Sequence, residues 1–168
     1  MVKSIQDILT LGEIVQRAHA NASPEAWDYM VGGSETETTL RRNRLALDEL
    51  AFRPRVLRDV SHIDTSTNML GMPLCMPVFF APMGSLDQLH DDAALVPACA
   101  AREFGIASMV SSVCPPGMET VMTEAGGNLM FQLYVRGDEA WIKDQMDQAQ
   151  ELGYKGFCIT VDTAMYGR

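Results

Sequence analysis

Side chains with hydrogen-bonding and acid–base capacity follow four short apolar runs in the second half of the sequence. Each run leads into polar groups or a glycine, and the residues concerned are Ala81, Pro82, Met83, Gly84, Ser111, Gln132, Tyr134, Thr160 and Asp162. Hydroxyl and amide groups donate and accept hydrogen bonds, a carboxylate accepts them, and glycine lets a main chain approach a ligand closely. Together these residues suit a ligand site, provided that the fold brings the ends of the four runs together.

The elements that must position these groups alternate between strands and helices. Four apolar runs are typical of strands buried on both faces, at about residues 78–81, 106–110, 129–133 and 156–161. Helical patterns separate them, at about residues 91–104, 116–125 and 138–152. Strand–helix units therefore repeat at roughly the thirty-residue period of a βαβ module, and helix-length crossovers predict parallel strands.

Two α/β architectures fit this alternation, an open doubly wound sheet and a (β/α)8 TIM barrel. In barrels, functional residues gather just past the carboxyl end of the strands, which is where the polar groups of this sequence fall. An open sheet would concentrate its site at one switch point, usually with a G-x-G-x-x-G turn, and the sequence has no such turn. The sequence therefore predicts a barrel.

The first part of the chain has the periodicity of helices. Apolar residues recur at helical spacing over about 5–18, with Ser4 as the predicted N-cap. Ser23 and Pro24 predict the start of a second helix, and a third helix is expected at about 36–47.

These elements predict two domains. Residues 1–76 are expected to form a helical segment with a short hairpin at Met69–Met76, packed on a barrel portion formed by residues 77–168. Eight strand–helix units need on the order of 200 to 250 residues. We therefore expect the N-terminal half of a barrel, completed by a C-terminal half-barrel polypeptide, because two apolar sheet edges would otherwise stay unpaired.

Composition excludes several classes of protein. The 168 residues are 47% hydrophobic and 21% charged, as expected of a globular domain rather than a disordered chain. The net charge of −9 argues against nucleic-acid binding and against adsorption to an anionic membrane. The four cysteines lack metal-site spacing, so no metal is expected. With no signal-peptide pattern and no membrane-length apolar run, a cytoplasmic protein is expected.

Eight different short motifs are distributed along nearly the whole chain, from about Gln6 to Arg168. They are Trp27-Asp28-Tyr29, Gly32-Gly33, Asn43-Arg44, Phe52 to Leu57, Ala81 to Gly84, Ser111-Ser112, Phe131 to Val135 and Thr160 to Thr163. In this order and spacing, the sequence resembles the FMN-dependent α-hydroxy acid oxidases and dehydrogenases, of the glycolate oxidase, lactate oxidase and mandelate dehydrogenase type.

This resemblance implies an FMN cofactor and oxidation of an L-2-hydroxy acid to a 2-oxo acid. It implies flavin-binding roles for Ala81, Pro82, Met83, Gly84, Ser111, Gln132 and Thr160. The main chain around Met83 and Gly84 would approach flavin N5, while Ser111, Gln132 and Thr160 would hydrogen-bond the pyrimidine side.

Three further residues gain roles from the resemblance. Tyr29 is similar to the tyrosine that binds the substrate carboxylate, and Tyr134 to the tyrosine beside the substrate hydroxyl. Asp162 is similar to the aspartate that orients the catalytic histidine, with the logic of the acid in a Ser-His-Asp triad. That histidine is expected in the second half of the barrel, so the isolated chain is expected to be inactive.

Three departures from the family pattern leave the substrate side chain and the electron acceptor open. Val113 stands where many relatives have an aromatic residue, Gly84 stands where several oxidases have alanine, and Ala164-Met165 stands where the family often has Pro-Arg. Hydride transfer coupled to proton removal is expected, with carbanion formation as the alternative. An FMN barrel with other chemistry, such as isomerisation, and a non-catalytic half-barrel that binds or scaffolds also fit. A homo-oligomer of the whole barrel would fit the family.

Overall fold

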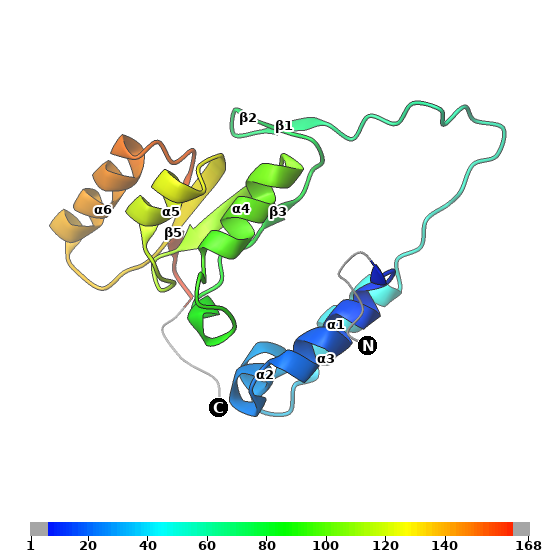
Figure 1. Cartoon of the computed structure of the whole chain (residues 1–168), viewed down its shortest axis with the longest axis horizontal. Helices are drawn as coiled ribbons and strands as arrows, with labels where there is room; N and C mark the ends of the chain where they lie inside the picture. Colours follow the sequence, from blue (N-terminus) through cyan, green and yellow to red (C-terminus); the bar gives the residue numbers. More distant parts are fainter. Residues whose placement is uncertain (1–6, 163–168) are drawn as a thin grey trace. The chain divides into compact units, whose positions relative to one another are not determined.

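The computed structural model describes residues 7–162, which divide into two compact units (Figure 1). The helical unit ends at Pro54, and the strand unit begins at Arg55. No helix among these described residues is long and apolar enough to cross a membrane.

The helical unit contains three helices, α1 (Leu11–Asn21), α2 (Pro24–Val31) and α3 (Thr38–Asp48). Helix α2 begins where the sequence predicts. The Ser23 hydroxyl accepts a hydrogen bond from the Ala26 amide at 3.2 Å, and Pro24 occupies the first helical position. Ala26 is the one buried side chain of these three helices, so their apolar faces stay exposed within the unit.

Helix α1 begins later than predicted. The Thr10 hydroxyl accepts from the Glu13 amide at 3.3 Å, and the Glu13 carboxylate accepts from the Thr10 amide at 3.0 Å. This capping box satisfies two amides that would otherwise lack a partner and fixes the helix start after Thr10. Residues 8–10 are therefore not helical, and the predicted cap Ser4 lies outside the described residues.

The strand unit contains the predicted parallel sheet. Its strands are β3 (Phe79–Phe80), β4 (Ala107–Ser111), β5 (Asn128–Tyr134) and β6 (Phe157–Thr160), paired in that order. Helices α4 (Leu95–Phe104), α5 (Met118–Glu124) and α6 (Glu139–Glu151) connect them and lie over one face (Figure 1). Since the strands run parallel, their carboxyl ends share one edge of the sheet, as the barrel prediction requires.

The two faces of the sheet carry different residues. Val110, Phe131 and Leu133 are buried in one core with Ala98 of α4 and Val121 of α5. The alternate residues of β4 and β5 face the other way, as the two-residue period of a strand requires.

A hairpin covers the amino-terminal part of that second face. Strands β1 (Thr67–Met69) and β2 (Met72–Leu74) pair antiparallel and bury Met72 against Ala107 and Met130. The hairpin thus belongs to the strand unit, and the division of the chain at residue 76 stays a prediction.

The two outer strands differ from the sequence prediction of burial on both faces. Phe79 and Phe80 of β3 are 41% and 36% exposed, and Ile159 of β6 is 40% exposed. Each outer strand pairs with one neighbour among the described residues, so its apolar side chains lack a partner on the other side. The periodicity of a sequence indicates which side chains need burial, and the four described strands do not bury these three.

Candidate functional site

A chain of three hydrogen-bonded side chains crosses the carboxyl ends of β4, β5 and β6. The Ser111 hydroxyl donates to Oε1 of Gln132 at 2.7 Å, and Nε2 of Gln132 donates to Oγ1 of Thr160 at 2.5 Å. Ser111 and Gln132 are level in the strand register, whereas Thr160 lies level with Tyr134, one layer further along. The long glutamine side chain therefore spans two layers of the sheet.

This polar chain has a fixed direction and unused donors. Because the Gln132 oxygen accepts from Ser111, its amide nitrogen must face Thr160. The second hydrogen of that nitrogen and the hydroxyl hydrogen of Thr160 stay available to a ligand. Ser111 and Gln132 are each 2% exposed, so low local dielectric strengthens their hydrogen bonds.

The segment Ala81–Gly84, after β3, reaches the same edge of the sheet through its contact with the segment after β4. The Ser85 amide donates to the Val113 carbonyl at 3.2 Å. The Val113 amide in turn donates to the Ser111 hydroxyl at 3.4 Å. These bonds place Gly84, the residue before Ser85, beside Val113 at the end of β4.

Tyr134 ends β5 and is half-buried, and its main chain is held by Ser112, a residue with no separate role predicted from the sequence. The Tyr134 amide donates to the Ser112 hydroxyl at 3.0 Å. The Ser112 amide donates to the Gln132 carbonyl at 2.8 Å. The position of Ser112 in the Ser111-Ser112 pair, at the end of a strand, was the signal that could have identified it.

The structure leaves two predicted residues apart from this network. Asp162 lies two residues beyond β6, is exposed, and forms no hydrogen bond or ion pair within residues 7–162. Tyr29 belongs to the helical unit, where its side chain is 66% exposed. The roles of both residues therefore stay predictions.

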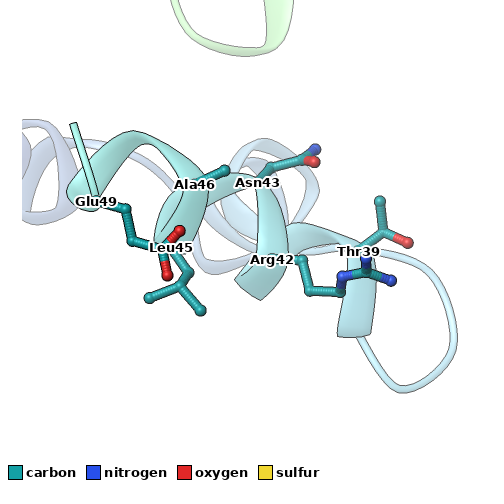
Figure 2. Close-up of a pocket in the computed structure, with 6 residues that line it drawn as sticks. All are labelled: Thr39, Arg42, Asn43, Leu45, Ala46 and Glu49. Atoms are coloured by element: carbon teal, nitrogen blue, oxygen red, sulfur yellow. The ribbon is translucent and has the colours of Figure 1, made fainter.

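A hollow also lies on the surface of helix α3 (Figure 2). Its lining residues come from α3 and its C-cap, namely Thr39, Arg42, Asn43, Leu45, Ala46 and Glu49. None of them is a predicted site residue. A hollow walled by one helix cannot enclose a ligand within this unit, so the strand ends are the stronger site.

Comparisons with known proteins find matches along most of the chain. The family model described as FMN-dependent dehydrogenase matches residues 18–168. Glycolate oxidase 3 of Oryza sativa subsp. indica is 35% identical over 161 residues, which cover 96% of this chain and 44% of that protein. L-lactate oxidase of Nostoc sp. is 34% identical over 170 residues, covering 98% and 46%.

Solved structures give the same picture. A crystal structure of mandelate oxidase matches with a TM-score of 0.90 at 30% identity, covering 96% of this chain and 47% of that chain. A structure of a mandelate oxidase mutant with (S)-mandelic acid matches with a TM-score of 0.89 at 29% identity, covering 96% and 48%. This chain thus spans about half the length of the relatives that it matches.

Proposed function

The chain belongs to the FMN-dependent dehydrogenase family, and from this premise we propose that it forms half of an enzyme that oxidises an L-2-hydroxy acid to a 2-oxo acid. Its fold is the N-terminal helices and the first four strands of a (β/α)8 barrel. The family is FMN-dependent, and FMN, when bound, takes up the two electrons that the substrate carbon loses.

The polar chain of Ser111, Gln132 and Thr160 is the observation that carries this proposal. A flavin pyrimidine ring presents carbonyl oxygens, which need hydrogen-bond donors, and an N–H group, which needs an acceptor. Gln132 and Thr160 retain one donor hydrogen each, and the hydroxyl oxygen of Thr160 can also accept. The donor set therefore fits the polar edge of the cofactor.

The main chain of Ala81, Pro82, Met83 and Gly84 would complete the flavin site on the side of β3. Gly84 has no side chain, which allows close approach of its main chain to a planar ring. The hydrogen bond from the Ser85 amide to Val113 holds this segment at the strand ends.

The residues near the substrate would act on its hydroxyl and carboxylate groups. Tyr134 would hydrogen-bond the substrate hydroxyl, and Tyr29 would hold the carboxylate. Oxidation removes two hydrogens from the substrate. The hydroxyl hydrogen leaves as a proton, and the hydrogen on the carbon that bears the hydroxyl leaves with its electron pair. Asp162 would orient a histidine of the second half-barrel, which takes the hydroxyl proton, and would stabilise the resulting imidazolium.

The exposed outer strands support a C-terminal half-barrel as the partner. Phe79, Phe80 and Ile159 present apolar surface, and β3 and β6 each have an unpaired edge within the described sheet. Four more parallel strands would pair with both edges and bury these side chains.

The test uses the chain together with the C-terminal half-barrel polypeptide. We expect the purified complex to be yellow, to contain one FMN per barrel, and to lose its visible flavin absorption when L-lactate, glycolate or (S)-mandelate is added under nitrogen. The D enantiomers of lactate and mandelate serve as controls. Bound flavin that no 2-hydroxy acid bleaches would favour another reaction, such as isomerisation. A colourless complex would favour a non-catalytic role.

A further inference from the structure

Gly84 and Val113 lie in contact at the strand ends, although they are far apart in the sequence. A Cβ atom added to Gly84 would lie 2.7 Å from Cγ2 of Val113 and 3.6 Å from its carbonyl oxygen. The first distance is too short for real carbon atoms, so Val113 already occupies the volume in which a side chain of residue 84 would lie.

This contact, rather than the backbone conformation, explains why residue 84 is a glycine. Gly84 is not among the glycines with a left-handed backbone, so an alanine could adopt its φ and ψ angles. The obstacle is the methyl group of Val113. A β-branched side chain is restricted at χ1, so this methyl cannot turn aside freely.

Val113 is itself held on both sides. Its carbonyl accepts from the Ser85 amide at 3.2 Å, and its amide donates to the Ser111 hydroxyl at 3.4 Å. The next residue, Cys114, is 4% exposed and donates its amide to the Ser111 carbonyl at 3.2 Å. Backbone movement therefore offers little relief for a larger residue 84.

We propose that Val113 is a positioning residue, which sets the place of the Met83–Gly84 main chain through its contact with Gly84. The two residues act as a size-matched pair, so these two of the three departures from the family pattern are one feature. The part of this proposal that concerns the flavin rests on the proposed function. The coupling between the two side-chain positions does not.

The experiment is a double-mutant cycle in the complex of both half-barrels, with Gly84→Ala, Val113→Ala and the double variant. FMN dissociation constants are measured by fluorescence quenching, and the visible spectrum of bound FMN is recorded. We expect Gly84→Ala to weaken FMN binding at least tenfold and to shift the spectrum. Val113→Ala removes the contact that positions the main chain and should weaken FMN binding about threefold, which is less than the effect of Gly84→Ala. The double variant should return to within threefold of Val113→Ala.

A control variant and a measurement without FMN distinguish failure of the Gly84–Val113 coupling from failure of the proposed function. Val96→Ala removes the same atoms from a valine on α4, which is 45% exposed, and should not rescue Gly84→Ala. The same cycle in thermal unfolding midpoints tests the contact without FMN. A double variant as defective as Gly84→Ala in both measurements would overturn the proposal. A complex that binds no FMN but shows rescue in the midpoints would overturn the proposed function alone.

Discussion

The hydroxyl of Ser111 lies 2.7 Å from Oε1 of Gln132, and this contact joins the carboxyl ends of two neighbouring parallel strands. It fixes which end of the glutamine amide faces Thr160. The amide nitrogen of Gln132 lies toward Thr160, nearer the carboxyl ends of the strands. The site therefore presents a donor where a flipped amide would present an acceptor. The direction of this amide is therefore part of what the site can recognise.

Replacing Gln132 by leucine should remove the centre of the polar chain. The buried Ser111 hydroxyl and the half-buried Thr160 hydroxyl then lose their partner. Leucine also lacks the amide hydrogen that Gln132 would donate to FMN. A polar group left unsatisfied on burial costs about 1 to 3 kcal/mol, so FMN affinity should fall by about tenfold to a hundredfold. Equilibrium titration of the assembled complex with FMN measures this change. Gln150→Leu, on the exposed surface of α6, is the matched control and should leave the affinity unchanged.

Asp162→Asn should lower turnover far more than flavin content. The carboxylate is exposed and forms no bond within residues 7–162, so its loss should not disturb the sheet. The amide cannot stabilise a protonated histidine as a carboxylate does. Turnover and the ratio of FMN to protein are measured on the same preparation. Equal losses of both would show that Asp162 is structural.

Tyr154→Phe should remove a pH dependence of stability. The buried Tyr154 hydroxyl donates to the Met118 carbonyl at 2.8 Å, and burial raises the pKa of this phenol. The folded state holds the phenol proton more tightly than the unfolded state does. The contribution of Tyr154 to stability is therefore complete below about pH 10, the ordinary pKa of tyrosine, and is lost as the pH rises above that value.

Urea unfolding of the complex at pH 8 and at pH 10.5 measures this effect. At pH 8 the variant should be about 1 kcal/mol less stable, because the hydrogen bond to Met118 is lost. The difference between the two proteins should shrink at pH 10.5. A constant difference at both pH values would contradict the assigned cause.

Met72→Ala should destabilise the strand unit without weakening FMN binding. Met72 is 1% exposed and packs against Ala107 and Met130, at the opposite end of the strands from the polar chain. Loss of a buried methionine side chain costs about 3 kcal/mol. Urea midpoints measure the loss, with Val60→Ala at a 69% exposed position as the control, expected to change stability by about 0.5 kcal/mol or less. A comparable effect of both variants would show that the hairpin contributes no core.

The sequence predicted the ends of those elements that have capping residues or prolines at the boundary. Ser23 and Pro24 placed the start of α2, and the parallel direction of the strands followed from the helix-length crossovers. The start of α1 was missed because apolar periodicity continues upstream of Thr10, whereas the capping box of Thr10 and Glu13 decides where the helix begins.

The candidate site was predictable in its location but not in its contacts. Ser111, Gln132 and Thr160 each stand at the end of an apolar run, which was enough to place them at one edge of the sheet. Their hydrogen bonds depend on the register between strands, which no single run of residues specifies. The contact between Gly84 and Val113 joins two loops, and a sequence pattern reports no such distance.

The unpaired edge of β3 has a kinetic consequence for the proposed barrel. In a closed ring of eight strands, the first strand pairs with the last, so β3 gains its second neighbour only after the whole ring has been assembled. In a complex of two half-barrels this pairing forms only when the two polypeptides dock, which is a concentration-dependent step. Phe79 and Phe80 would thus stay accessible through most of assembly, which makes this edge the place where a molecular chaperone or a wrongly paired strand would bind first.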